Sequence, residues 1–203
     1  DGDNLIFSLD TDAENGGVTI DGSLATYIPN TNFNGDDSFI FAVGDGDLSS
    51  TATISLTIDP VNDAPELAVI NTVLFDEDTI GSTSLSGSDV DGDELTYSIT
   101  DGVDITASLT GSDVTFSAPL HFNGSESFTA SVSDGEYTDS HTFTVTVNAV
   151  NDPPVANSAS ATTNEDQSIV ITLTGSDIDG DNLIFSLDTD AENGGVTIDG
   201  SLA

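Results

Sequence analysis

The sequence contains no lysine, no arginine and no cysteine. A chain without permanent cations cannot neutralise phosphates, which excludes nucleic-acid binding through the usual basic contacts and disfavours an anionic membrane surface. The same absences exclude Schiff-base chemistry, arginine clamps for anions, thiolate chemistry and disulfide bonds. No apolar run is long enough to insert into a bilayer. With no initiating Met and no signal peptide, the chain is interpreted as an internal segment of a longer protein.

Acidic residues are the abundant class. They number 37, of which 29 are Asp and 8 are Glu, and they give a formal net charge of -37 with both His neutral. Aspartate is the short carboxylate of turns and of loops that bind cations through oxygen. Because no basic side chain offsets this charge, self-repulsion must be relieved by external cations, by salt or by wide spacing of the charges. Calcium is the first candidate for such a cation.

Two internal repeats organise the chain. Residues 1–25 recur unchanged as residues 179–203, so the long period is 178 residues (179 − 1). A weaker repeat of half that length matches residues 62–65 (NDAP) with residues 151–154 (NDPP), an offset of 89 residues (151 − 62). Further matches at similar spacing pair residues 88–93 (SDVDGD) with 176–181 (SDIDGD), 76–78 (DED) with 164–166 (NED), and 33–35 with 122–124 (both FNG).

The repeats set the expected domain boundaries. Residues 62–150 are expected to form one complete module. Residues 1–61 correspond to the C-terminal part of a sister module, and residues 151–203 to the N-terminal part of the next repeat. A partial sandwich has an open core and an unpaired edge, so both partial modules are expected to belong to a longer array. The alternative is that the tail of one chain completes the head of the next and builds a head-to-tail filament.

Apolar and polar residues alternate with a period of two in many short segments, and no segment has a convincing helical period. About seven such segments per module, separated by Gly, Asp and Asn turns, predict an all-β fold of tandem immunoglobulin-like or cadherin-like Greek-key β-sandwiches. The predicted strands include residues 39–43, 52–58, 95–99, 114–116, 128–132, 143–147, 169–173 and 183–187.

The carboxylates gather at a few recurring places. In the complete module these are the Asn-Asp of the linker, the triplet 76–78, the turn 88–93 and the Asp-Gly at 134–135. Calcium takes six to eight oxygen ligands, which clustered short carboxylates supply. An EF-hand is excluded because, with Asp89 as position one, Gly92 is at position four rather than six, and position twelve is Thr100 rather than Glu. The pattern therefore predicts calcium binding near the linkers.

In combination, these motifs resemble the bacterial cadherin-like tandem repeats of giant calcium-dependent surface adhesins. The resemblance rests on the NDAP and NDPP linkers, the acidic triplets, the SDxDGD turns followed by Leu, and the FNGxxSF segments that lead to Asp-Gly. It covers essentially the whole chain. It implies the cadherin-like fold and calcium bound between adjacent repeats.

The resemblance also implies the metal ligands. One junction would combine Asn62, Asp63, Asp89, Asp91 and Asp134. The second junction would combine Glu77, Asn151, Asp152, Asp177 and Asp179. Asp45 is the counterpart of Asp134 in the sister module, and Glu165 is the counterpart of Glu77.

The chain also departs from the cadherin pattern. The linkers lack the final Asn of the cadherin linker motif, and the leading Asp is displaced to Asp59, which is Asn148 in the second linker. The Asp-Arg-Glu motif has no clear counterpart, with Asp36, Asp37 and Glu126 as the nearby candidates. Fewer ions per junction than in animal cadherins are therefore expected.

Several polar residues are assigned no special role. His121 and His141 are replaced by Asn32 and Ala52 in the sister module, so ordinary surface positions are expected for both. Isolated acids, namely Asp104 and Asp139, are interpreted as turn residues that bond to their own backbone.

The resulting hypothesis is a non-enzymatic structural repeat. Calcium-rigidified modules would extend a large extracellular adhesin or fibre from a bacterial cell surface. Their partners would be calcium ions and neighbouring repeats of the same chain, or head-to-tail copies. The alternative is that the modules themselves bind glycans or partner proteins. Paired carboxylates also serve glycoside hydrolysis, but here they lie in repeated turns without a pocket-forming insertion.

Overall fold

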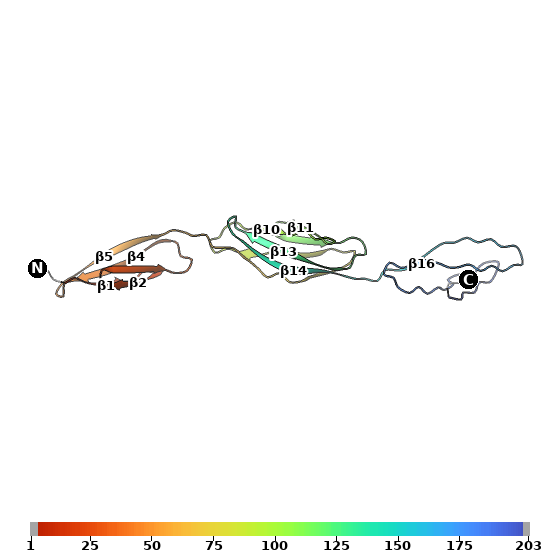
Figure 1. Cartoon of the computed structure of the whole chain (residues 1–203), viewed down its shortest axis with the longest axis horizontal. Helices are drawn as coiled ribbons and strands as arrows, with labels where there is room; N and C mark the ends of the chain where they lie inside the picture. The colour runs from red at the N-terminus through yellow and green to blue at the C-terminus, as the bar shows by residue number, and fades with distance from the viewer. Residues whose placement is uncertain (1–3, 201–203) are drawn as a thin grey trace. The chain divides into compact units, whose positions relative to one another are not determined.

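The computed structural model describes residues 4–200, and all regular structure in that range is β (Figure 1). No helix occurs there, and therefore none that could cross a membrane. The predicted all-β class is confirmed. The strands are β1 (Ile6–Thr11), β2 (Gly16–Asp21), β3 (Leu24–Pro29), β4 (Gly35–Gly44), β5 (Ser49–Ile58), β6 (Glu66–Leu67), β7 (Val73–Asp76), β8 (Gly81–Ser84), β9 (Gly87–Ser88), β10 (Thr96–Ile99), β11 (Thr106–Thr110), β12 (Asp113–Ser117), β13 (Gly124–Ser133), β14 (Thr138–Asn148), β15 (Val155–Ala156) and β16 (Gly175–Ser176).

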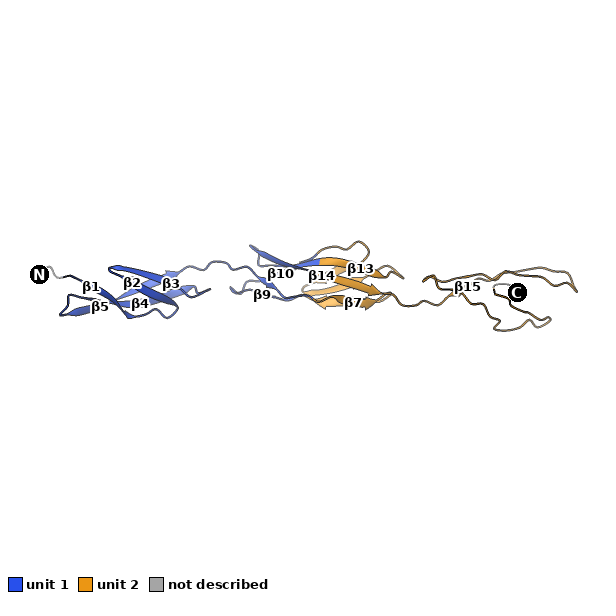
Figure 2. Cartoon of the chain, turned by 60° about the horizontal axis from the view of Figure 1, so that its bottom comes forward, with its two compact units in different colours: residues 1–70, 85–99, 129–142 blue, residues 71–84, 100–128, 143–203 orange. Residues whose placement is uncertain are grey.

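The chain divides into two compact units (Figure 2). The first comprises residues 1–70, 85–99 and 129–142, and the second comprises residues 71–84, 100–128 and 143–203. The long strands β13 and β14 contribute residues to both units, and they are the central strands of the sheet ordered β10-β13-β14-β7.

In the first unit, β1, β4 and β5 form an antiparallel sheet, and β2 and β3 form a hairpin. Inward-facing residues build a small core of Ala13, Val18 and Phe39. The hairpin turn needs a left-handed residue, which Gly22 supplies with φ of 59°. Two further pairings belong to this unit, β6 with β9 and β10 with β13.

In the second unit, β12 lies between β11 and β8, and β7 runs parallel to the end of β14. Phe116 of β12 packs edge-on against Phe128 of β13, with ring centroids 5.3 Å apart, and against Phe143 of β14 at 6.1 Å. These contacts join the two sheets face to face, as in a β-sandwich. Phe116 and Phe128 are fully buried, and each stabilises the fold by about 1.5–3 kcal/mol.

The predicted strands at 169–173 and 183–187 do not form; within them only residue 172 makes an isolated β-bridge. Residues 184–189 have the same sequence as β1 (IFSLDT), yet only β1 is a strand. β1 pairs with β4, whereas no counterpart of β4 follows residues 184–189 in the sequence. Strand formation here depends on the partner that accepts the ladder hydrogen bonds rather than on local propensity.

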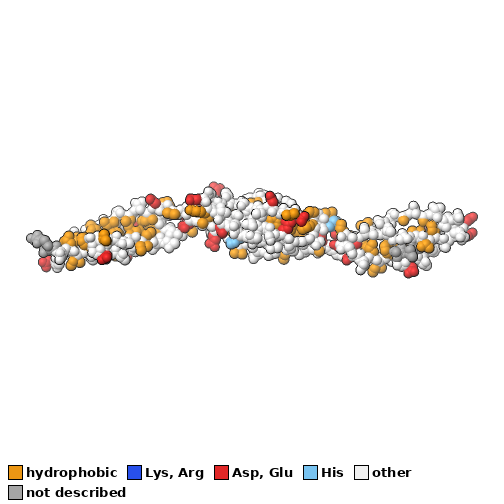
Figure 3. Space-filling view, in the orientation of Figure 1, with side chains coloured by type: hydrophobic (Ala, Val, Ile, Leu, Met, Phe, Trp, Pro, Cys, Tyr) orange, Lys and Arg blue, Asp and Glu red, His pale blue; other side chains and the backbone are white. Residues whose placement is uncertain are grey.

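Hydrophobic side chains remain exposed over the N-terminal segment, where they are orange in Figure 3. Ile54 is 38% exposed, whereas its counterpart Phe143, 89 residues later (143 − 54), is 5% exposed. Phe143 is buried against the rings of Phe116 and Phe128. Residues 4–58 contain no counterparts of β6 to β9, so fewer elements are available to cover Ile54.

Candidate metal sites

The turn after β9 collects three carboxylates. Asp89 Oδ1 accepts backbone N–H groups from Asp91 at 2.8 Å, from Gly92 at 3.0 Å and from Asp93 at 3.3 Å. One carboxylate oxygen from each of Asp89, Asp91 and Asp93 lies within 4.8 Å of the others. Asp89 Oδ2 is buried and has no hydrogen-bond partner among the described residues. The turn therefore concentrates negative charge and leaves one inward oxygen unsatisfied, which fits a cation ligand.

The first linker is held against this turn. The Asp63 N–H donates to Asp91 Oδ2 at 2.7 Å, and Asn62 Nδ2 donates to Asp134 Oδ2 at 2.9 Å. The structure thus gathers all five predicted residues of this junction around one linker, and their role as ligands stays a prediction. Three further polar residues lie here that were not among the predicted ligands. Asp93 is in the turn, and Asn32 and Asp59 line a hollow together with Asp63 and Asp91.

Asp134 and Asp45 occupy equivalent turns. Asp134 Oδ1 accepts the N–H groups of Glu136 and Tyr137, and Asp45 Oδ1 accepts those of Asp47 and Leu48. Partial burial acts to raise the pKa of Asp134, but hydrogen bonds from Tyr137, Asn62 and Glu136 outweigh it and leave the pKa below its ordinary value. The hydrogen bonds from Leu48 and Asp47 likewise lower the pKa of Asp45. Within residues 4–200, Asp45 caps its own turn.

The second linker repeats the geometry of the first. The Asp152 N–H donates to Asp179 Oδ2 at 2.7 Å, as Asp63 does to Asp91. Asp177 Oδ1 accepts the N–H groups of Asp179 at 3.0 Å and Asp181 at 3.2 Å, which reproduces the Asp89 turn. The Asn151 side chain donates to the Asp152 carbonyl at 3.0 Å. The same sequence motif therefore builds the same arrangement twice.

Glu77 adds a buried carboxylate to the second linker. Its side chain is 4% exposed; Oε1 accepts the Val150 N–H at 2.5 Å, and the Glu77 N–H donates to the Asn148 carbonyl at 2.9 Å. Oε2 is buried without a hydrogen-bond partner in the described part of the chain. An uncompensated buried charge costs several kcal/mol, so Glu77 fits a cation ligand. Its counterpart Glu165 is exposed, in a segment that does not form strands.

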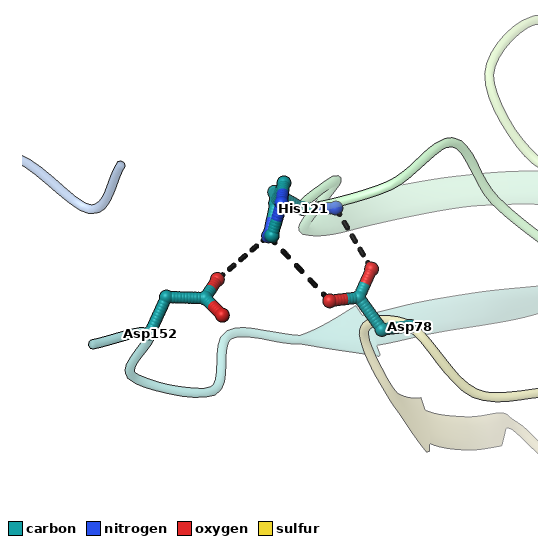
Figure 4. A group of neighbouring side chains, drawn as sticks. All are labelled: Asp78, His121 and Asp152. Atoms are coloured by element: carbon teal, nitrogen blue, oxygen red, sulfur yellow. Dashed lines mark hydrogen bonds and ion pairs between the residues drawn. The ribbon is translucent and has the colours of Figure 1, made fainter. Parts of the chain in front are cut away.

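His121 and Asp78 form a cluster with Asp152 that the sequence did not suggest (Figure 4). His121 Nδ1 lies 2.7 Å from Asp152 Oδ2 and 3.5 Å from Asp78 Oδ2, and the His121 N–H donates to Asp78 Oδ1 at 2.9 Å. The hydrogen bond to Asp152 raises the pKa of His121, and the charges of Asp152, Asp78 and Glu77 reinforce this against the effect of partial burial.

The prediction of an ordinary surface position is therefore wrong for His121. Its side chain is 27% exposed, compared with 43% for His141, which lies 3.9 Å from Asp139. The sequence contained one signal for this role: His121 stands where the otherwise similar turn of the sister module has Asn32. Both residues adopt left-handed backbone, with φ of 61° for Asn32 and 58° for His121.

Other acids brace loops. Asp37 accepts backbone N–H groups from Glu14, Asn15 and Ser38 and the Tyr27 hydroxyl. Partial burial acts to raise the pKa of Asp37, but the hydrogen bonds from these groups outweigh it and lower the pKa. Glu126 is the counterpart of Asp37, 89 residues later (126 − 37). It accepts the backbone N–H groups of residues 103, 104 and 105, in the loop that corresponds to residues 14 and 15.

These contacts bear on two expectations. Asp37 and Glu126 brace loops, and Asp36 accepts the Thr57 hydroxyl at 3.0 Å; their correspondence to the Asp-Arg-Glu ligands stays a prediction. Asp139 accepts the N–H of Ser140 as expected, but it also accepts the Leu67 N–H at 2.9 Å and so connects β14 to β6. The N–H groups of Leu67 and Ser140 lower the pKa of Asp139.

The sequence matches the bacterial Ig domain family over residues 1–57, 62–148 and 151–203. The chain belongs to this family. The match confirms the immunoglobulin-like class and the resemblance to bacterial tandem repeats of cadherin-like type. Comparison with curated proteins finds no match.

Solved structures give weaker similarities to these bacterial Ig domains. An endo-fucoidan hydrolase from glycoside hydrolase family 107 is 25% identical over 73% of this chain and 24% of its own, with a TM-score of 0.36. Human protocadherin-24 EC1-2 is 24% identical over 58% of this chain and 61% of its own, with a TM-score of 0.40. Drosophila N-cadherin EC1-4 is 12% identical over 100% of this chain and 58% of its own, with a TM-score of 0.46.

Proposed function

We propose that these bacterial Ig domains are calcium-rigidified extender repeats of a large extracellular adhesin or surface fibre on a bacterial cell. The observation that carries the proposal is the geometry shared by the two linkers. In each, the linker Asp donates its N–H to the second Asp of an Asp-x-Asp turn, at 2.7 Å in both cases. A repeated arrangement that positions carboxylates beside every linker is suited to repeated cation binding.

The chain's own residues prepare these sites. Backbone N–H groups hold one oxygen of Asp89 and one of Asp177, which fixes both side chains while their second oxygens stay available. Asn62, by its bond to Asp134, connects the linker to the turn after β13. When bound, calcium would supply the positive charge that the sequence lacks and would join the linker to the adjoining turns.

An extender role follows from joining modules through such linkers. Strands β13 and β14 have 10 and 11 residues, so a module adds roughly 35 Å along its strands. We take residues 62–150 as one complete repeat, flanked by partial repeats at 1–61 and 151–203. The role is non-catalytic, because the clustered carboxylates are bound to linker and turn backbone in both repeats.

Calcium titration of the chain tests the proposal, with thermal melting and small-angle X-ray scattering as readouts. Calcium should raise the melting temperature and increase the maximum dimension of the particle. The double variant Asp89→Asn/Asp91→Asn should lose much of both responses. The control Asp101→Asn/Asp104→Asn removes the same number of charges from exposed positions outside the clusters and should respond like the parent chain.

Two results would overturn the calcium-extender role. One is an absence of any calcium response in either readout. The other is an equal response in the cluster variant and its control, since the carboxylates would then act only through net charge. Binding to a glycan array by the parent chain would favour the alternative role as a ligand-binding module.

A further inference from the structure

We propose that Asp78, His121 and Asp152 form a site for a divalent transition metal such as Zn²⁺. The site lies where the complete module meets its second linker, and Figure 4 shows the side chains of Asp78 and Asp152 directed at the His121 ring. It is chemically different from the oxygen-only arrangements of the proposed calcium sites, although it shares Asp152 with one of them.

The ligand types select the class of metal. Calcium is bound by oxygen, whereas imidazole nitrogen is a preferred ligand of zinc, copper and nickel. One His nitrogen with carboxylate oxygens is a donor set that zinc accepts in tetrahedral geometry. Asp78, His121 and Asp152 each offer one ligand atom, and these atoms lie within 4.8 Å of one another.

The distances are compatible with such a site. In a tetrahedral zinc centre with bonds of 2.0–2.2 Å, neighbouring ligand atoms are about 3.3–3.6 Å apart. Asp78 Oδ2 and His121 Nδ1 are already separated by 3.5 Å. Asp152 Oδ2, at 2.7 Å from the same nitrogen, would have to move by less than about 1 Å, and its side chain is only part-buried.

The backbone holds two of these ligands in place. The His121 N–H donates to Asp78 Oδ1, which leaves Oδ2 directed at the ring nitrogen. Asp78 and His121 both have left-handed backbone, with φ of 61° and 58°. Because Asp78 Oδ1 is already hydrogen-bonded, Asp78 Oδ2 is oriented toward the ring nitrogen before a metal binds.

Glu77, the residue before Asp78, is a second sign that this end of the module favours a cation. Its Oε2 is buried, has no hydrogen-bond partner among the described residues, and belongs to a side chain that is 4% exposed. Its negative charge also acts on the His121 ring.

The site belongs to one type of module. The sister module has Asn32 where this module has His121, in the same left-handed conformation. The substitution His121→Asn therefore installs a residue that the repeat itself uses at this position. It removes the nitrogen ligand with little change expected in the turn.

Isothermal titration of the calcium-free chain with ZnCl2 tests the site. The parent chain should bind one Zn²⁺, and His121→Asn should weaken the affinity by at least about 100-fold. His141→Asn removes the other histidine and should bind Zn²⁺ like the parent. A separate titration with CaCl2 should give affinities within about threefold for the parent and His121→Asn.

The outcomes separate this site from the calcium proposal. Loss of zinc binding in His121→Asn alone, with calcium binding retained, supports it. No zinc binding by the parent, or equal zinc binding by His121→Asn, would overturn it and leave His121 as a hydrogen-bonded partner of Asp152. Failure of calcium binding with zinc binding intact would overturn only the calcium role. Circular dichroism and melting of His121→Asn without metal establish that the variant is folded.

Discussion

Replacing Glu77 by glutamine should stabilise the calcium-free fold and should remove most of the stabilisation that calcium gives. Without calcium, Glu77 has one oxygen bonded to the Val150 N–H and one buried oxygen without a partner. Glutamine retains an acceptor for Val150 and removes the buried charge. Because an unsatisfied buried group costs about 1–3 kcal/mol, and more when charged, Glu77→Gln should stabilise the calcium-free fold by about that amount.

Calcium should stabilise the variant much less than it stabilises the parent. At a calcium concentration of about 100 times Kd, binding stabilises the native state by about 2.7 kcal/mol. If the substitution weakens binding about 100-fold, the same concentration stabilises the variant by only about 0.4 kcal/mol. For a module of this size, about 4–8 °C per kcal/mol gives a calcium-induced rise in Tm of about 10–20 °C for the parent and about 2–3 °C for the variant.

The assay is thermal unfolding followed by circular dichroism in EDTA and in saturating CaCl2. Glu66→Gln is the matched control, because it makes the same chemical change at an exposed position of the same module. It should leave both melting temperatures unchanged. A Glu77→Gln variant that melts lower than the parent in EDTA, or that keeps the full calcium-induced rise, would refute the assignment of Glu77 as a buried cation ligand.

Four further outcomes are expected. Phe116→Ala should lower the free energy of unfolding by about 3–5 kcal/mol in urea denaturation, because Phe116 joins the two sheets. Gly81→Ala should lower the free energy of unfolding by about 1–3 kcal/mol in the same assay, since a Cβ there would overlap the Phe75 ring. The pKa of Asp37 is lowered in the fold, so the ionised carboxylate stabilises the native state above the unfolded pKa of about 3.9. This stabilisation is lost as the pH falls through the pKa of the folded state. Asp37→Asn should therefore lower Tm at pH 7 and flatten the fall of Tm below about pH 4. Trypsin should leave the chain intact on gels even in EDTA, because it has no Lys or Arg, while chymotrypsin should cleave it once calcium is removed.

The strands that sequence predicts well are those whose partners lie within the same stretch of chain. Residues 39–43 and 52–58 alternate with a period of two, and both fall within the paired strands β4 and β5. Residues 183–187 alternate in the same way, yet they form no strand. Periodicity states which face of a strand would be buried, but whether the strand forms depends on hydrogen bonds to a partner that the local sequence does not contain.

The candidate sites also differ in whether local sequence or distant pairing determines them. The Asp89 turn and its copy at Asp177 were predictable because a short motif specifies a local turn. The burial of Glu77 was not predictable, because an acidic triplet in the sequence is typical of an exposed turn. It is buried because the parallel register of β7 and β14 places Asp76 opposite Asn148, which brings Glu77 under the Val150 N–H. That register connects residues more than 70 positions apart.

The two linkers differ in their chemistry. Two differences between the junctions alter their charge: Asp59 corresponds to Asn148, and Asn32 corresponds to His121. The first change removes an acid and the second introduces a group that can carry positive charge, so both make the second linker less negative. The first linker keeps an oxygen-only set, with Asn32 and Asp59 in one hollow beside Asp63 and Asp91. The two junctions of this chain therefore differ in the ligand atoms they offer: the first has oxygen alone, and the second adds the imidazole nitrogen of His121.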